Sequence, residues 1–327
     1  EGRDGFYEGE IAEDMVASLN VLGGVHTLDD FAATQCDYTT PISGAYRDVE
    51  LVEHPPNGQG ATAILLANIL SHFDMSSFDP HGAAPAHIEA EATKLAYDAR
   101  NRFLADPDYM TRLDHMLDPG TADALAQLID PKMAQPHNTT IAESVHKDTV
   151  YLTVVDKDRM AVSLIYSVFH SFGAGLASKK FGINFQNRGA GFSLVPGHPN
   201  EAGGGKRPMH TIIPGMLKKA GKVIMPFGVM GGQYQSTGHV RFMSNLVDFG
   251  MDPQEAMDGP RCFSENGILK VERGYAPDVR QGLIDLGHKV ETPDTAIGGS
   301  QAILIDEALG VLQGGSDPRK DGLALGY

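Results

Sequence analysis

The feature that most constrains the fold is a pair of apolar, β-branched runs between Thr149 and Ser167, separated by a short polar segment. The first run reads TVYLTVVD, the second reads MAVSLIYS, and KDR (157–159) lies between them. Two such runs on either side of a three-residue loop are typical of a β-hairpin. In this register Asp156 pairs with Met160, and counting outward places Thr149 opposite Ser167.

The predicted hairpin places one hydroxyl group opposite another, on Thr149 and Ser167. Threonine is a weak nucleophile with no base of its own, and an enzyme that uses one usually recruits the free α-amino group of the same residue as the base. That amine exists only if the chain is cut before Thr149. If Thr149 is such a nucleophile, the Asp148–Thr149 bond would be the cleavage point.

Around this bond, HKDTVYLTVVDKDRMAVSLIYS (146–167) resembles the start of the small subunit of the γ-glutamyltransferase family, which consists of N-terminal-nucleophile (Ntn) hydrolases. Further segments fall in the family's order along nearly the whole chain: GFYEGEIAEDM (5–15), TPISGAYRD (40–48), EAEATKLAYDARNRFLADPDY (89–109), KRP (206–208), GGQ (231–233), DFGMDPQEAMDGPR (248–261) and SDPRKDGLALGY (316–327). The resemblance implies an α+β fold, the four-layer αββα sandwich of Ntn hydrolases. It implies no cofactor and no metal.

The resemblance also implies how the chain is divided. Residues 1–148 are expected to be the C-terminal part of a large subunit, mostly helical and ending in a mobile segment. Residues 149–327 are expected to be a complete, β-rich small subunit, so that both subunits come from one precursor. GFYEGEIAEDM matches the middle of the family's large subunit, so the N-terminal part of that subunit is expected to be absent.

Catalytic roles follow from the resemblance position by position. A threonine at the place of Thr149 first cleaves its own precursor and then attacks γ-glutamyl amides such as glutathione. Ser167 matches a position, often threonine, whose hydroxyl contacts the amino group of the nucleophile. Gly231 and Gly232 match the glycines that hold the oxyanion, and two consecutive glycines at a strand end can expose backbone N–H groups for this purpose.

The acyl pocket departs from the family pattern at several positions. Gly191 stands where the family has an aspartate that binds the substrate α-amino group, and Phe169 replaces an asparagine that holds the same part of the substrate. Met209 and His210 replace two serines that contact the α-carboxylate. Because an ammonium group buried without a carboxylate is costly, γ-glutamyl binding is expected to be weaker by several kcal/mol. A glutaryl-type acylase, acting on β-lactam side chains, is therefore an alternative on the same scaffold.

The loop between Ser193 and Arg207 is short beside family members that carry a lid over the active site. Water is therefore expected to reach the acyl-enzyme, which favours hydrolysis over transfer to an amino acid or peptide acceptor. A third hypothesis, from another class, is a non-catalytic relative that is never processed.

The charge balance excludes several partners. Lysine and arginine total 26 against 42 acidic residues, and this net charge of −16 repels nucleic acid and anionic membranes. No stretch approaches the roughly 20 apolar residues of a membrane span. Cys36 and Cys262 form no disulfide framework or metal pattern. A small-molecule amide is the expected partner, and the compartment, cytoplasmic or periplasmic and secreted, stays open.

Two further motifs have simpler interpretations. GGGKR (203–207) is similar to a phosphate-binding loop, but Asn200 and Arg207 stand where that motif needs Gly and Ser or Thr. His87 and Glu91 lie one helical turn apart, with no third metal ligand close in sequence, and are expected to lie on a solvated helix face.

Local signals predict the regular elements. Helices are expected after Thr27, after PPNGQG (55–60), and over 86–105, 238–249, 253–258 and 278–286. Strands are expected at FGINF, at GFSLV, in TIIPGMLKKAGKVIMPFGVMGG, and in the closing pair SQAILID and GVLQGGS. Residues 110–148, which hold several prolines, are expected to form an exposed, mobile connection.

Overall fold

The computed structural model describes residues 2–136 and 149–327, which form an α+β protein. Its residues group into two compact units that alternate along the chain. The described part of the first unit comprises residues 2–40 and 167–190. The described part of the second unit comprises residues 41–136, 149–166 and 191–327, and it contains the six-stranded and the three-stranded sheets.

The first unit is built on short helices: α1 (Gly2–Tyr7), α2 (Glu10–Val21) and α3 (Leu28–Ala32). Thr27 caps α3 in a reciprocal capping box with Asp30, as the sequence predicts. Asp14 and Ser18 of α2 accept hydrogen bonds from the backbone N–H groups of the loop at 179–181. These bonds hold the two segments of the unit together.

The second unit is centred on a six-stranded sheet in the order β1-β2-β5-β6-β10-β11. Each neighbouring pair is antiparallel, as in a sheet made mostly of hairpins. The strands are β1 (Ile42–Tyr46), β2 (Val49–Glu53), β5 (Gly215–Lys219), β6 (Lys222–Met230), β10 (Gly299–Asp306) and β11 (Val311–Ser316). The predicted hairpin at 215–230 and the predicted closing pair are confirmed.

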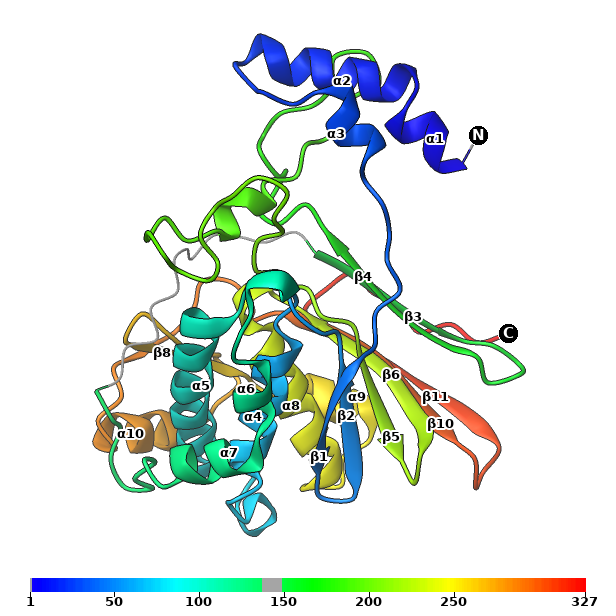
Figure 1. Cartoon of the computed structure of the whole chain (residues 1–327). Coiled ribbons are helices and arrows are strands. Elements are labelled where there is room, and N and C mark those ends of the chain that lie inside the picture. The colour runs from blue at the N-terminus through cyan, green and yellow to red at the C-terminus, as the bar shows by residue number, and fades with distance from the viewer. Residues whose placement is uncertain (1, 137–148) are drawn as a thin grey trace. The chain divides into compact units, whose positions relative to one another are not determined.

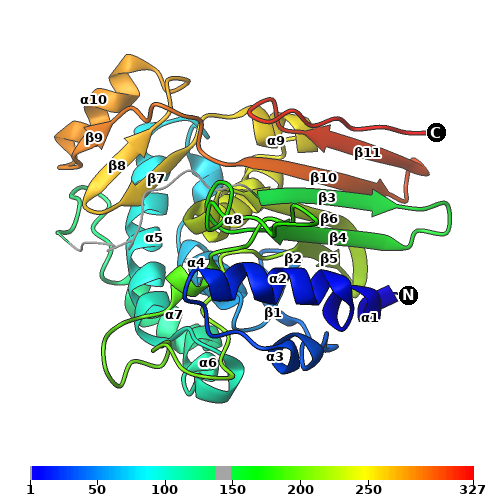
Figure 2. The same ribbon diagram turned by 90° about the horizontal axis from the view of Figure 1, so that it is seen from above.

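A separate hairpin, β3 (Thr149–Val155) with β4 (Ala161–Ser167), covers one face of this sheet (Figures 1 and 2). The ring of Tyr151 lies directly on Gly228, where a side chain would leave no room for it. The predicted three-residue turn is confirmed, because the Asp156 N–H donates to the Met160 carbonyl (3.1 Å). Arg159 takes the left-handed conformation (φ +67°) that such loops need at their last residue.

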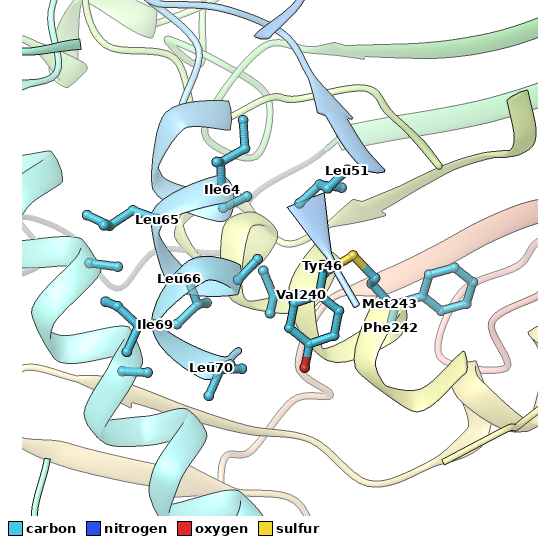
Figure 3. Close-up of a cluster of buried hydrophobic side chains, with 14 of the residues drawn as sticks. Tyr46, Leu51, Ile64, Leu65, Leu66, Ile69, Leu70, Val240, Phe242 and Met243 are labelled. Carbon is cyan, nitrogen blue, oxygen red and sulfur yellow. The ribbon is translucent and has the colours of Figure 1, made fainter. Parts of the chain in front are cut away.

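Helices cover the opposite face of the sheet (Figure 1). The central one, α4 (Gly60–Leu70), is buried on all sides except at Asn68, which explains why its sequence is apolar throughout. It packs between α5 (Ala83–Phe103) and α8 (Gln235–Val247). Figure 3 shows the resulting core of α4, α8, β1 and β2 side chains. Helices, sheet and hairpin thus form successive layers, and the predicted α+β sandwich is confirmed.

A second, smaller sheet flanks α5. It contains β7 (Cys262–Glu265), β8 (Ile268–Val271) and β9 (Val290–Glu291), with α10 (Pro277–Asp285) beside it. Helix α9 (Pro253–Asp258) begins with the predicted proline, and Asp252 caps it in a capping box with Glu255.

The predicted exposed connection at 110–148 is wrong for the part that the structure describes. Helices α6 (Leu113–Leu117) and α7 (Pro119–Ala126) lie there and pack against α4, with Met116 and Ala122 buried. Pro119 is the first residue of α7, where proline is favoured and interrupts nothing. Residues 137–148 lie outside the described residues.

Two predicted strands are also wrong. FGINF (181–185) and GFSLV (191–195) form isolated bridges only, Ala177 with Asn184 and Ser193 with Glu201. In the first segment the chain turns back tightly, since the Gly182 N–H donates to the Ser178 carbonyl (3.0 Å), and no longer ladder can form.

Among residues 2–136 and 149–327, no helix combines the length and the apolar character that a membrane span requires.

Candidate active site

Thr149 is the first residue of β3, and β3 packs on β6. Tyr151, two residues further, contacts Gly228 and belongs to a buried cluster with Met230, the last residue of β6. Since side chains on a strand alternate, Thr149 faces the same side as Tyr151. Thr149 therefore lies at the end of the sandwich where β6 passes into Gly231 and Gly232.

The two glycines make the turn from β6 into α8. Their φ angles, +129° at Gly231 and +57° at Gly232, are ones that side chains disfavour. The carbonyl of Gly231 accepts from the Tyr234 N–H (3.2 Å), which starts the helical turn. The carbonyl and the N–H of one peptide point in opposite directions, so the Gly232 N–H, which shares a peptide with this carbonyl, points away from the helix, as in an anion-binding N-terminus.

A buried polar network supports this turn from behind. The Gln59 amide donates to the carbonyls of Gly232 (3.0 Å) and Thr211 (2.7 Å). The Tyr97 hydroxyl donates to the Gln233 carbonyl, and Arg100 donates to the side chains of Gln59 (3.0 Å) and Gln233 (2.5 Å). Sequence reasoning missed these residues, although PPNGQG and the 89–109 segment were both noted for other reasons.

The structure brings together three of the predicted substrate-binding residues. Gly191 approaches the Met209 backbone so closely that a Cβ at 191 would lie 2.9 Å from the Met209 carbonyl oxygen. Asn200 joins the two by donating to the Gly191 carbonyl (2.7 Å) and accepting from the Met209 N–H (2.9 Å). His210 follows, and its backbone N–H donates to the Asn57 carbonyl (2.8 Å). Through Thr211 this strip meets the Gln59 network behind Gly232.

Ser167 and Phe169 belong to the first unit. The Ser167 hydroxyl accepts a hydrogen bond from the Phe169 N–H (2.9 Å), so it satisfies a neighbouring backbone group. Phe169 is buried with φ +77°, its ring stacked on His170 and covered by the Arg188 guanidinium. Asn adopts this backbone conformation more readily than a bulky aromatic residue does. Asp148 lies outside the described residues.

The segment GGGKR (203–207), whose sequence departs from the phosphate-loop motif, contacts other parts of the chain. Lys206 donates to the Pro199 carbonyl (2.5 Å), and its ammonium lies over the Tyr109 ring. The Arg207 N–H donates to Asp106 (2.8 Å). These groups bind parts of the protein itself.

The expectation of a solvated helix face at His87 and Glu91 is wrong, since both are buried. His288, far away in sequence, completes a group whose ligand atoms lie within 4.8 Å of one another. Protein groups already contact these atoms. His87 Nδ1 lies 2.7 Å from His288 Nε2, and the Glu91 carboxylate accepts a hydrogen bond from the Lys94 ammonium (2.6 Å). Lys94 supplies the positive charge that a metal ion would bring, so we interpret the cluster as a hydrogen-bond network.

This network predicts a pH-dependent stability. Burial, followed by the nearby charges of Lys94 and His87, lowers the pKa of His288 to about 3. Between that pKa and the ordinary value of about 6.5, the unfolded chain binds the extra proton, so stability falls as pH falls. We expect a loss of at most about 1.4 kcal/mol per pH unit from this group. Urea unfolding from about pH 7 to about pH 4 measures it.

The matched variant is His288→Gln, which keeps an amide near the same place but does not titrate. Its unfolding free energy should depend less steeply on pH than that of the wild type. Equal slopes for the two proteins would show that His288 is not protonated on unfolding in this range.

The family model for gamma-glutamyltranspeptidase matches residues 1–327. The chain is 37% identical to a glutathione hydrolase-like YwrD proenzyme of Bacillus subtilis, over 99% of this chain and 63% of the relative. It is 34% identical to a glutathione hydrolase proenzyme of Escherichia coli, over 100% of this chain and 59% of the relative. The chain thus spans less than two thirds of these relatives.

A crystal structure of a cephalosporin acylase from Bacillus halodurans has a similar fold. It superposes with a TM-score of 0.90 and 36% sequence identity, over 99% of this chain and 60% of that one.

Proposed function

Because the chain belongs to the γ-glutamyltranspeptidase family, we propose that the protein is an autoprocessing amidohydrolase with Thr149 as its nucleophile. Cleavage between Asp148 and Thr149 gives a large and a small subunit from one precursor. The substrate is a small γ-glutamyl amide such as glutathione, and no cofactor takes part. The relatives named above are proenzymes, which agrees with a precursor that is cut.

The proposed reaction has two steps. The α-amine of Thr149 takes the proton of its hydroxyl while Oγ bonds to the acyl carbon, and the proton passes to the leaving amine as the C–N bond breaks. Water then attacks the ester, restoring the hydroxyl and releasing the acid. In the family, the hydroxyl at the place of Ser167 contacts this amine, and we assign the same role to Ser167. The N–H groups of Gly231 and Gly232 stabilise the oxyanion in both steps.

One observation carries this proposal. The Tyr151 ring packs against Gly228 and Met230 of β6. This packing brings the first residue of β3 close to the end of β6, where the glycine turn leads into helix α8. A threonine hydroxyl at a strand start and a glycine turn at a helix start thus lie at one end of the same layered unit, which supports the roles proposed for them. That is the juxtaposition an acyl-transfer site needs.

Mass spectrometry of the full-length protein, together with turnover of γ-glutamyl- and glutaryl-p-nitroanilide, tests it. We expect two fragments, one beginning at Thr149, and release of nitroaniline from at least one substrate. A single uncut chain without turnover would favour the non-catalytic alternative.

A glutaryl-type acylase is the second candidate, and the geometry at Gly191 favours it. A carboxylate side chain there requires the Met209 carbonyl to shift, because its oxygen lies 2.9 Å from the position of the added Cβ. A substrate without an α-amine needs no such partner. The similarity to a cephalosporin acylase agrees with this candidate.

We expect the wild type to accept the glutaryl anilide at least as well as the γ-glutamyl anilide. Gly191→Asp should shift kcat/KM towards the γ-glutamyl substrate by about 10- to 150-fold relative to Gly191→Asn, because a charge-assisted contact contributes about 1.5–3 kcal/mol. The asparagine variant is the control, since it has the same crowding against Met209 without the charge. Phe169→Asn, which suits the local backbone, should add to the shift.

The wild-type ratio decides between the two acyl groups. A hundredfold preference of the wild type for γ-glutamyl would contradict the acylase candidate. The α-amine would then have a partner other than residue 191.

A further inference from the structure

Arg100 is a buried cation that lacks the usual partner. Only 2% of its surface is exposed, and its guanidinium hydrogen-bonds to the side-chain oxygens of Gln59, Gln233 and Asn101. All of these acceptors are neutral amides. None of the ion pairs within residues 2–136 and 149–327 involves Arg100. Burial lowers the pKa of Arg100 to about 10, so the group stays charged at neutral pH.

A buried charge without a carboxylate is costly, and it persists where the surrounding contacts require it. The buried arginines nearby follow the ordinary pattern, since Arg241 pairs with Glu89 (3.0 Å) and Arg261 with Asp317. Arg100 instead lies over the ring of Tyr97, with its Cζ 4.2 Å from the ring centre. The polar contacts of the Arg100 guanidinium are therefore hydrogen bonds to the side-chain amides around it.

The contacts of Arg100 lead directly to the glycine turn. A guanidinium can only donate, so it fixes the oxygen of each glutamine amide towards itself. The Gln59 NH2 group is thereby aimed at the carbonyls of Thr211 and Gly232. On the same side, the Tyr97 hydroxyl holds the Gln233 carbonyl. Two successive peptides, 232–233 and 233–234, are thus held from behind, and they directly follow the peptides that carry the Gly231 and Gly232 N–H groups.

The position of a backbone donor depends on the peptides beside it. Gly231 and Gly232 have the most mobile backbone of any residue type, and the turn would have many conformations without external restraint. An oxyanion hole works because its donors are held in place before the reaction. A positive charge buried behind the turn also favours negative charge in front of it.

We propose that Arg100, acting through Gln59 and Gln233, is the positioning residue of the oxyanion site. This inference rests on the proposed function, in which the N–H groups of Gly231 and Gly232 bind the oxyanion. It assigns to α5 and to the start of α4 a role in positioning the backbone donors.

The test compares Arg100→Met, Arg100→Lys and Gln59→Leu in the full-length protein, with kcat and KM for both anilides. We expect Arg100→Met and Gln59→Leu to lower kcat about tenfold or more, while KM changes less than about threefold, because the contact is used in the transition state. Arg100→Lys keeps the charge and should recover part of the loss. Thermal unfolding confirms that each variant is folded.

Arg47→Met is the matched control. Arg47, at the β1–β2 turn, donates hydrogen bonds to the Asp248 carboxylate and to the carbonyls of Ser71 and Phe73. Its loss therefore removes several hydrogen bonds away from the glycines. We expect lower stability with kcat within about threefold of the wild type. A folded Arg100→Met or Gln59→Leu variant with the same unchanged kcat would overturn the inference. Where Arg100→Met does not fold, Gln59→Leu and Arg100→Lys decide by the same criterion.

A double-mutant cycle with Gly232→Val checks the route. If Arg100 acts through the turn, Arg100→Met should lower kcat little further in a chain that already carries Gly232→Val. Losses of kcat that multiply in the double variant would contradict this. A wild type that turns over neither anilide, or a Gly232→Val variant at full rate, would remove the proposed function itself. Those results are distinct from a failure of Arg100 alone.

Discussion

The Thr149→Ala variant is expected to remain a single uncut chain and to lose all measurable turnover. One hydroxyl serves as nucleophile in both reactions, so both disappear together. Electrophoresis and mass spectrometry follow cleavage, and release of nitroaniline follows turnover. Cleavage that persists in this variant would place the nucleophile at another residue.

Thr149→Ser is the matched control for that experiment. It keeps the hydroxyl and loses only a methyl group, so cleavage and part of the activity should remain. If serine were as inactive as alanine, the methyl group or the strand position, and not the hydroxyl, would be the essential feature.

Gly231→Ala and Gly232→Val are each expected to lower turnover by about 100-fold or more, the magnitude seen when one oxyanion donor is lost. A Cβ at 231 would lie 2.9 Å from the Gly298 Cα, so the backbone must shift. At Gly232 a β-branched residue is incompatible with φ +57°. The rate is measured on chains that have already been processed, so that a defect in cleavage is not counted.

Gly221→Ala separates this effect from general strain. Gly221 also has a positive φ (+81°), at the β5–β6 turn, and open space lies around it. Its substitution should cost about 1 kcal/mol of stability and leave turnover unchanged. Near-normal rates in both oxyanion variants would show that the glycine pair is only a turn.

Much of the secondary structure could be predicted because its signals are local. The Asp156–Met160 turn, the Thr27 cap and the Asp252–Pro253 helix start each depend on residues within four positions of one another. The misses have local causes too. The polar, proline-containing segment 110–148 was expected to be a connection without regular structure, although Pro119 begins α7. The short strands β1, β2, β7 and β8 give too little alternation to be recognised.

The candidate site was only partly predictable for the same reason. Thr149 and the two glycines were chosen by their resemblance to a family, and their roles remain predictions. The closeness of Gly191 to Met209 follows from the path of a loop between them, which no periodicity describes.

By itself, the sequence determined the family, the hairpin that begins at Thr149 and the identity of the glycine turn, since each is written in contiguous residues. Only the tertiary structure decided what supports them. Arg100 meets Gln59 across 41 positions and Gln233 across 133, and His87 meets His288 across 201. Such contacts form because packing α4, α5 and α8 on one sheet removes water from these groups, and each buried polar group must then find a partner within the protein.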